Sequence, residues 1–440
     1  MTGERRRMAA LGVIGAALLL LTGIGLLLQY RDAHDAFIAV ALLQGALYLA
    51  AVWLVIRGRL PRRGFLVILG VAAMMRIGVV LAPPYLSDDL YRYVWDGRVE
   101  AAGINPYRYV PSDTHIAWLR DETIYPNINR RTYAPTIYPP VAEYIFLLAT
   151  RLSESVTWMK LTMVAFELAS VLILLRLLAS ASLPRERILI YAWHPLALWE
   201  FAGSGHIDAA IVTFVALALW ARRREAAWFT GIALAAAALV KFFPVVIFPA
   251  LYRRWDWKMP VAAVAATIVA YLPFLGAGPA VLGFLPGYVA EEGLDNGTGF
   301  FLRNLVMAAV PSAHIGVAAY LAAAAAILAS LGLYIVFSRR AGLHFAAAAA
   351  VLAAASTLLM SPHFAWYFTW LLAFLCLVPS AAILYLSVAG LLLYFISGGP
   401  DLDGSRMMVE AAIYGPFAVL AVLELRRLSR PIPVWVKREA

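Results

Sequence analysis

The sequence predicts an all-α integral membrane protein, a single polytopic domain over residues 1–440 with about 12–14 transmembrane or re-entrant helices. Three observations lead to this fold class. The 440 residues are 63% hydrophobic and 14% charged, with a mean hydropathy of +0.79. Apolar runs long enough to cross a bilayer recur along the whole chain. Basic residues gather in the short breaks between these runs.

The basic residues set the expected orientation in the membrane. The chain has a formal net charge of +10, and its basic residues cluster in breaks such as 57–63, 222–224, 253–258 and 426–437. Because lysine and arginine mark cytoplasmic loops, we expect these breaks in the cytoplasm. Their wide separation is not typical of a nucleic-acid-binding face. The pattern therefore predicts a multi-pass protein of the inner, cytoplasmic membrane with no nucleic-acid partner.

The first three spans are expected near residues 8–28, 36–56 and 65–82. The first follows basic residues 5–7, as a secretory signal would, but no small-residue cleavage site comes after it, so we expect it to be retained. The third span delivers the chain outside. Segment 83–140 is therefore expected to be a large outer loop that carries interfacial helices.

The later spans follow the same logic. Pro244 and Pro249 divide segment 226–252, which predicts two short helices that enter the membrane and return. Glycine and proline residues mark 277–303 as a second outer loop. The other spans are expected near 157–179, 187–203, 206–221, 259–276, 314–337, 345–361, 364–378, 380–397 and 406–425.

The large outer loop begins with a cluster of charged residues that has two interpretations. In the structural one, Ser87 caps an interfacial helix whose charged side chains, Asp89, Arg92 and Asp96 among them, pair along one face. In the functional one, Asp88 or Asp89 acts as a general base at the membrane surface, and Arg92 orients it. The two interpretations are compatible.

The rest of this loop is rich in tyrosine and proline. Tyr107 follows an Asn-Pro pair, and Tyr138 precedes two prolines. An interfacial aromatic belt explains such tyrosines. Aromatic faces also stack on sugar rings, so both tyrosines are candidates for binding a hydroxyl-rich ligand.

Three polar residues lie at the outer end of the hairpin 187–221. Glu200 is costly in an apolar span and is expected to face a cavity or a partner. His206 and Asp208 belong to a Ser-Gly-His-Ile-Asp turn that is explained equally well by structure alone. Two residues of this kind are weak support for a metal site.

Several cations near apolar segments need counter-ions. Lys241 stands beside the helix break at Pro244, where it either snorkels to the lipid headgroups or pairs with a phosphate. Arg76 on the third span and Arg303 at the end of the second outer loop pose the same choice.

A last motif begins another helix at the outer side. His363 follows a Ser-Pro pair and precedes Trp366 and Tyr367. A proline-led helix start with an aromatic belt explains the motif structurally. Functionally, His363 can donate a hydrogen bond or a proton to a phosphate near neutral pH.

Taken in order, these motifs are SDDLYRYVWDGR at 87–98, NPY at 105–107, YPP at 138–140, GSGHID at 203–208, KFFP at 241–244 and SPH at 361–363 with Trp366 and Tyr367. The ordered set resembles the polyprenyl-phosphate-mannose-dependent mannosyltransferases, bacterial multi-pass glycosyltransferases of the GT-C fold. It covers most of the chain. The chain departs from the simplest GT-C layout by placing two spans before the one that leads into the first outer loop.

The resemblance implies a GT-C-like bundle and inverting transfer of a hexose, with mannose the expected sugar, from a polyprenyl-phosphate donor to a lipid-linked or glycan acceptor at the extracytoplasmic face. It places the role of base on Asp88 or Asp89, and favours Asp89, the acid two residues before the tyrosine. The residues expected to bind the donor phosphate are Arg76, Lys241, Arg303 and His363. Those expected to bind substrate are Arg92, Asp96, Tyr107, Tyr138, Glu200, His206, Asp208, Trp366 and Tyr367.

Two other classes of protein fit parts of the pattern. A transporter or flippase of lipid-linked sugars is also polytopic, but such proteins often contain internal repeats and bind their substrates near the midplane. An acyl- or phospho-transferase ordinarily has a strong His-Asp or metal-ligand motif, of which His206 and Asp208 are the only trace.

No metal cofactor is expected, because fixed cations can serve a lipid-monophosphate leaving group. The single cysteine, Cys376, excludes a cysteine cluster and an intramolecular disulfide. The expected partners are the donor, the acceptor and membrane lipids, and the protein is expected to be a monomer.

Overall fold

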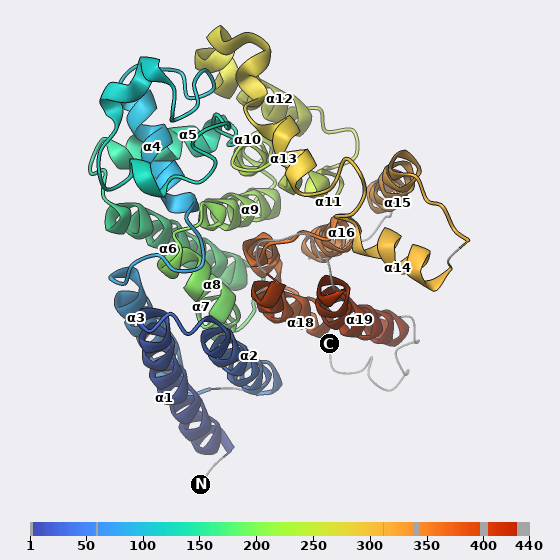
Figure 1. The fold of residues 1–440 in the computed structure, drawn as a ribbon. Helices are drawn as coiled ribbons and strands as arrows, with labels where there is room; N and C mark the ends of the chain where they lie inside the picture. Colours follow the sequence, from blue (N-terminus) through green and yellow to red (C-terminus); the bar gives the residue numbers. More distant parts are fainter. Residues whose placement is uncertain (1–2, 59, 311, 338–343, 397–403, 429–440) are drawn as a thin grey trace.

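The computed structural model describes residues 3–58, 60–310, 312–337, 344–396 and 404–428, and within these ranges the chain forms helices and no strands (Figure 1). The all-α prediction is therefore confirmed for the described chain. The first part contains α1 (Gly3–Tyr30), α2 (His34–Arg57), α3 (Arg62–Val80), α4 (Asp89–Ala101), η1 (Thr114–Leu119), η2 (Tyr125–Asn127), α5 (Pro140–Thr150), α6 (Val156–Ser180), η3 (Arg185–Ile188), α7 (Leu189–Ala192), α8 (Pro195–Ala197), η4 (Leu198–Gly203), α9 (Asp208–Arg223) and α10 (Ala227–Ala238). The second part contains η5 (Phe243–Ile247), α11 (Phe248–Leu251), α12 (Lys258–Tyr271), η6 (Leu272–Leu282), α13 (Leu285–Glu291), α14 (Phe301–Ala309), α15 (Val317–Phe337), α16 (His344–Met360), η7 (Ala365–Leu371), α17 (Leu372–Leu375), α18 (Ala381–Ala389), η8 (Gly390–Ile396) and α19 (Ser405–Leu428).

Seven helical segments of the described chain are long and apolar enough to cross a membrane. They are Gly3–Tyr30, His34–Arg57, Arg62–Val80, Val156–Ser180, Lys258–Glu291, Val317–Phe337 and Ser405–Arg426. Shorter apolar helices occupy Pro140–Thr150, Ala227–Ala238, Phe345–Met360, Ala365–Leu375 and Ala381–Ile396. The integral-membrane prediction is confirmed by these segments.

Some predicted spans are not continuous α-helices. The expected span 187–203 is divided into η3, α7, α8 and η4, because Pro195 begins a new helix and the last six residues form a π-helix. The expected span 364–378 begins as the 3₁₀-helix η7 and continues as the short α17. Segment 226–252 contains the predicted break, since α10 ends at Ala238 and η5 begins at Phe243.

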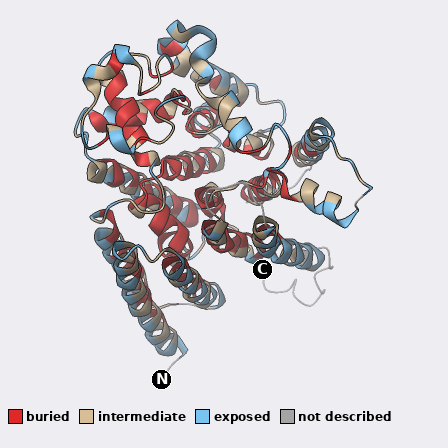
Figure 2. Ribbon diagram, viewed as in Figure 1, coloured by how far each residue is buried: buried red, intermediate tan, exposed pale blue. Residues whose placement is uncertain are grey.

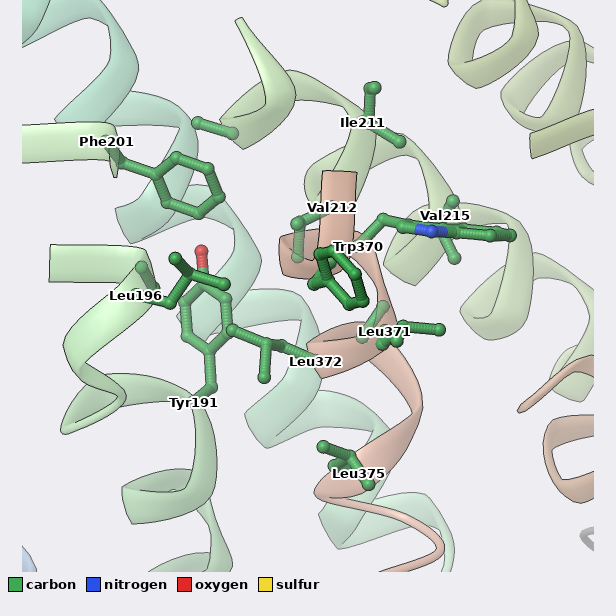
Figure 3. Packing of buried hydrophobic residues seen from close by; sticks show 14 of the residues in the cluster. Tyr191, Leu196, Phe201, Ile211, Val212, Val215, Trp370, Leu371, Leu372 and Leu375 are labelled. Carbon is green, nitrogen blue, oxygen red and sulfur yellow. The ribbon is translucent and has the colours of Figure 1, made fainter. Parts of the chain in front are cut away.

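The hydrophobic core lies around α9, which is buried along most of its length. Side chains of α7, η4 and α9 meet those of η7 and α17 there, including Tyr191, Val212 and Leu372 (Figure 3). Figure 2 shows buried residues on α4 and α9 and many exposed ones along α1 and α15. Those exposed surfaces are apolar, with Val13 and Leu333 as examples, which is typical of helices that face lipid.

The segment between α3 and α5, residues 81–139, folds beside the segment that contains η6 and α13 (Figure 1). Asn105 Nδ2 donates to the Phe274 carbonyl oxygen at 3.0 Å, and Arg108 donates to that of Gly276 at 2.8 Å. The backbone N–H of Phe284 donates to the Thr136 carbonyl oxygen at 3.0 Å. We call these two regions the first and second loop segments.

Candidate functional site

Helix α4 positions the first acidic residue of the site. The side chain of Ser87 accepts a hydrogen bond from the Asp89 backbone N–H at 3.2 Å. Asp88 occupies the N-cap position, and its side chain makes no capping bond, so the expected cap lies one residue away from where the helix begins. Leu90 and Tyr93 are buried and fix α4 against the bundle. Asp89 is thereby held at the start of a rigid helix.

Three polar side chains, two from the first loop segment and one from the turn before α9, surround Asp89. Asn129 of the first loop segment donates to Asp89 Oδ1 at 2.7 Å. The Tyr138 hydroxyl donates to Oδ2 at 3.5 Å, and His206 Nδ1 lies 4.0 Å from the same oxygen. The Asp89 side chain is 17% exposed. It is therefore a positioned carboxylate that a ligand can still reach.

Arg92 and Asp96 pair with each other on the next turns of α4. Their 2.8 Å ion pair has the expected i,i+4 spacing, and both side chains are buried. Arg92 also donates to the Ala134 carbonyl oxygen at 3.0 Å. Burial raises the pKa of Asp96, although Arg92 opposes the shift. The pair holds the first loop segment in place, and its direct role in substrate binding stays a prediction.

Lys241 finds its counter-ion in Asp208. Lys241 Nζ donates to Asp208 Oδ2 at 2.6 Å, and it lies 4.7 Å from the centre of the Tyr367 ring. Asp208 follows His206 by two residues, so Lys241 is held next to the turn that faces Asp89. Lys241 lies in the break between α10 and η5, and its side chain is only 11% exposed, so it does not snorkel away as the structural alternative expects.

Glu200, His206 and Trp366 form a buried cluster behind Asp89. His206 Nε2 lies 3.5 Å from Glu200 Oε2, and both side chains are fully buried. The His206 ring stacks on Trp366 with centroids 4.2 Å apart. The π-helical turn η4 carries Glu200 and brings it to His206, which precedes α9. The sequence prediction that Glu200 meets a polar partner is supported by this placement.

His363 lies at a neighbouring cavity of about 180 Å³. Its Nδ1 is 2.9 Å from Glu292 Oε2, and its Nε2 is 3.1 Å from the Gly299 carbonyl oxygen. Tyr367 also lines the cavity, and its hydroxyl contacts that of Tyr288 at 2.7 Å. Most of the lining is apolar, with Phe243, Leu294, Met360 and Trp370 among its residues.

The structure gives three other predicted residues partners of their own. Arg76 pairs with the buried Glu167 at 2.7 Å and donates to the Ala192 carbonyl oxygen. Arg303 donates to the carbonyl oxygens of Ile315 and Gly297. The Tyr107 hydroxyl donates to the Tyr138 carbonyl oxygen at 2.6 Å and thus holds a residue of the site. No contact of Arg76 or Arg303 with the residues around Asp89 is found in the described chain, and their phosphate-binding role stays a prediction.

Sequence reasoning missed several residues of the site. Asn129 is an ordinary loop residue, and only its place in the same loop as Asp89 pointed to it. Tyr288 and Glu292 lie on or next to α13, within the segment expected to be the second outer loop. These residues reach the site through the fold of the second loop segment, so no local motif marks them.

No group of three or more histidine, cysteine, aspartate or glutamate side chains suited to hold a metal ion occurs in the described ranges. The predicted absence of a metal cofactor stays a prediction. The single-domain organisation of residues 1–440 also stays a prediction.

The chain matches one protein-family model over residues 8–256, more than half of its length. That model describes the N-terminal domain of alpha-(1->6)-mannopyranosyltransferases. No curated protein and no solved structure matches the chain. The matched region includes Asp89, His206 and Lys241. The match supports a glycosyltransferase and not a transporter, an acyltransferase or a phosphotransferase. The chain therefore belongs to the alpha-(1->6)-mannopyranosyltransferase family and is a membrane glycosyltransferase.

Proposed function

We propose that the protein transfers mannose from a polyprenyl-phosphate donor to a lipid-linked or glycan acceptor, with inversion at the anomeric carbon. One observation carries the proposal: a positioned and partly exposed carboxylate, Asp89, faces the turn at 206–208, to which the ammonium of Lys241 is bound through Asp208. A base and a cation are the two groups that this transfer needs.

The reaction balances with Asp89 as the base. The acceptor hydroxyl oxygen attacks the anomeric carbon of the donor, and its proton passes to an oxygen of Asp89. The bond between the anomeric carbon and the phosphate oxygen breaks, and the electron pair leaves with the polyprenyl phosphate. Each carboxylate oxygen has two lone pairs, so Asp89 can accept this proton while Asn129 remains bound to Oδ1.

Lys241 is the residue best placed to bind the departing phosphate. An ammonium has three donors, so Nζ can donate to a phosphate oxygen while it keeps its bond to Asp208. His363 is a second phosphate ligand in this proposal. Because both of its present partners are acceptors, it must exchange one of them for the phosphate.

The cavity beside His363 suits the first isoprene units of the donor. Its lining is mainly apolar, and its polar edge is formed by His363, Glu292 and the Tyr288–Tyr367 pair. A lipid monophosphate has the same division between an apolar chain and a charged head. The match supports a lipid-linked donor over a nucleotide sugar.

The family description supports the stereochemistry. It names an α-(1→6) linkage, so inversion requires a β-linked donor and a primary 6-hydroxyl as the attacking group. The positive-inside pattern supports a position for Asp89 on the extracytoplasmic side of the inner membrane. We propose that the protein acts there as a monomer.

The test uses the purified full-length protein in detergent. Polyprenyl-phosphate-[¹⁴C]mannose and a membrane lipid extract are supplied, and the products are identified by mass. Wild-type protein is expected to form a mannosylated product, and Asp89→Asn is expected to lose at least about 100-fold in rate, the usual contribution of a general base. Donor binding should persist in this variant.

Asp88→Asn is the matched control, because Asp88 is the adjacent, more exposed carboxylate. It is expected to retain most of the activity. Full activity in Asp89→Asn contradicts the assignment of the base. Transfer from polyprenyl-phosphate-glucose but not from the mannose donor contradicts the assignment of the sugar.

A further inference from the structure

His206 lies between two carboxyl groups that belong to different elements. Its Nδ1 faces Asp89 Oδ2 of α4 at 4.0 Å, and its Nε2 faces Glu200 Oε2 of η4 at 3.5 Å. The His206 and Glu200 side chains are fully buried, while Asp89 is partly exposed. The imidazole thus connects the proposed base to a carboxyl group with no access to solvent.

Two buried polar atoms in this arrangement need a proton between them. Glu200 Oε2 and His206 Nε2 both lack a hydrogen-bond partner within the described chain, and they face each other. Leaving such atoms unpaired costs about 1–3 kcal/mol each. A single proton shared between Oε2 and Nε2 satisfies both, so this pair is best explained as one protonated unit.

The position of that proton follows from the other side of the ring. Nδ1 faces the Tyr93 hydroxyl at 3.5 Å and the Asp89 carboxylate at 4.0 Å. The hydroxyl can donate or accept, whereas the ionised carboxylate only accepts. A hydrogen on Nδ1 serves the carboxylate, and in a neutral imidazole Nε2 is then an acceptor. Only a protonated Glu200 can donate to it. Glu200 Oε1 meanwhile accepts from the Tyr394 hydroxyl at 2.5 Å, which fixes the carboxyl group in this orientation.

The backbone holds His206 firmly in this position. Its N–H donates to the Glu200 carbonyl oxygen at 2.9 Å, and its ring stacks on Trp366. The preceding Gly205 has a φ of +71°, and a Cβ there would lie 2.6 Å from Leu90 Cδ1. The turn therefore requires glycine, and it sets both the ring and the carboxyl group.

We propose that His206 and Glu200 are positioning residues for Asp89: protonated Glu200 fixes the imidazole tautomer in which Nδ1–H points at Asp89 Oδ2. This inference rests on the proposed function. Asn129 then holds one oxygen of the base and His206 holds the other. The 4.0 Å separation is expected to shorten when the substrates bind, as is common for catalytic hydrogen bonds.

The arrangement makes activity depend on the ionisation of Glu200. When Glu200 loses its proton at alkaline pH, Nε2–H becomes the favoured tautomer, and Nδ1 then presents a lone pair to Asp89. The other titratable groups around the ring are Tyr93 beside Nδ1, Tyr138 beside Asp89, Tyr394 beside Glu200, and the Lys241–Asp208 pair. Because Lys241 and Asp208 balance each other, Glu200 is the group that sets the tautomer.

The test compares variants in the assay with polyprenyl-phosphate-[¹⁴C]mannose. Glu200→Gln should keep kcat within about threefold at neutral pH, because an amide N–H donates to Nε2 as the acid does. Wild-type kcat should decline as Glu200 loses its proton at alkaline pH, and Glu200→Gln should abolish this alkaline decline. Glu200→Met, which cannot donate, should lower kcat about 10- to 100-fold with an unchanged donor KM. His206→Phe keeps a ring beside Trp366 and should show the same loss.

His194→Asn is the matched control. His194 is another fully buried histidine, its Nε2 contacts Ser387 Oγ, and its Nδ1 caps α8 as an asparagine oxygen can. Its kcat and pH profile should match those of the wild type. Thermal unfolding of each variant confirms that it is folded.

Three outcomes overturn the proposal: a Glu200→Gln variant as impaired as Glu200→Met, an alkaline decline that persists in Glu200→Gln, or wild-type kcat in His206→Phe. The first shows that an ionised carboxylate is needed. A wild-type protein that fails to use the mannose donor contradicts the proposed function instead, so the two failures are distinguishable.

Discussion

Asp88 and Asp89 are adjacent carboxylates in different surroundings. Asp88 is exposed at the N-terminus of α4, and partial desolvation of its carboxyl group together with the Asp89 carboxylate raises its pKa. Asp89 points to Asn129, Tyr138 and His206. The exposed acid at the helix cap and the acid surrounded by donors are thus consecutive residues, and their different surroundings favour Asp89 as the base.

At the same scale, Lys241→Met is expected to weaken donor use. A charge-assisted hydrogen bond contributes about 1.5–3 kcal/mol, so the donor KM should rise about 10- to 100-fold, with a smaller effect on the acceptor. The substitution also leaves Asp208 buried without its counter-ion, which destabilises the fold. The measurement is initial rate against donor concentration.

The double variant Asp208→Asn/Lys241→Met separates the two effects. It should recover thermal stability and keep the defect in donor use. Lys258→Met, at an exposed lysine that begins α12, is the control and should behave as the wild type. A normal donor KM in the double variant excludes Lys241 as a phosphate ligand.

Glu100 gives a prediction about pH and stability. Burial, with a smaller contribution from Asp96, raises its pKa to about 7, and its Oε2 is buried without a hydrogen-bond partner. The protonated form therefore stabilises the fold below the ordinary pKa near 4.5, and this stability is lost as pH rises to about 7. Above pH 7, Glu100→Gln should therefore unfold at a higher temperature than the wild type. Its free energy of unfolding should be larger by about 1 kcal/mol after allowance for solvent screening.

Thermal unfolding between pH 5 and 8 in detergent measures this effect. The difference between Glu100→Gln and the wild type should grow with pH over that range. Glu122→Gln, at an exposed carboxylate of the same loop segment, should show no such growth. A difference independent of pH contradicts the prediction.

At the scale of elements, the close packing of α4 on α5 determines where Asp89 lies. Gly97 of α4 permits it: a Cβ there would collide with the Phe146 carbonyl and lie 2.6 Å from Thr150 Oγ1. The Tyr93 ring stacks on Phe146 with centroids 4.5 Å apart. The two helices therefore hold the beginning of the first loop segment in one position.

Gly97→Ala is expected to destabilise the protein by about 1–3 kcal/mol, because α4 and α5 must separate. The catalytic rate should fall as well, since Asp89 moves with α4. Gly70→Ala on α3 is the matched control, because nothing lies within 4 Å of a Cβ there. Thermal unfolding and activity are measured on both variants. Unchanged stability in Gly97→Ala shows that α4 does not depend on this contact.

At the scale of the whole molecule, two loop segments far apart in the sequence are joined above the bundle. Arg130 pairs with Glu291 at 2.6 Å, and the Tyr133 hydroxyl donates to the same carboxylate at 2.9 Å. The site therefore combines groups from α4, η4, α9 and the second loop segment. The site contains the cation Lys241, which pairs with Asp208.

The presence of this fixed cation predicts that transfer needs no divalent metal. Activity in EDTA should equal activity without it, because Lys241 and His363 serve the departing phosphate in place of a metal ion. The measurement is product formed with EDTA alone and after magnesium or manganese is returned. Loss of transfer in EDTA that either metal restores contradicts the prediction.

Many residues of the site could be predicted from local sequence motifs. Lys241 beside a helix break and Glu200 in an apolar span both stood out because a buried charge is costly anywhere in a membrane. Asn129 and Tyr288 did not stand out, because an asparagine or tyrosine in a loop has no such cost. The division of span 187–203 was also missed: hydropathy measures whether a segment is apolar and does not measure whether its helix is continuous.

The sequence by itself determined the membrane-embedded helical class, the loop that carries Asp89 and the family, because hydropathy and short motifs are local properties of the chain. Only the tertiary structure decided which charges pair. Arg76 has Glu167 as its partner, 91 positions away, and Lys241 has Asp208 on a different helix. The placement of His206 between Glu200 and Asp89 was decided in the same way. Such pairs depend on how helices pack against one another, and packing joins residues that no local pattern connects.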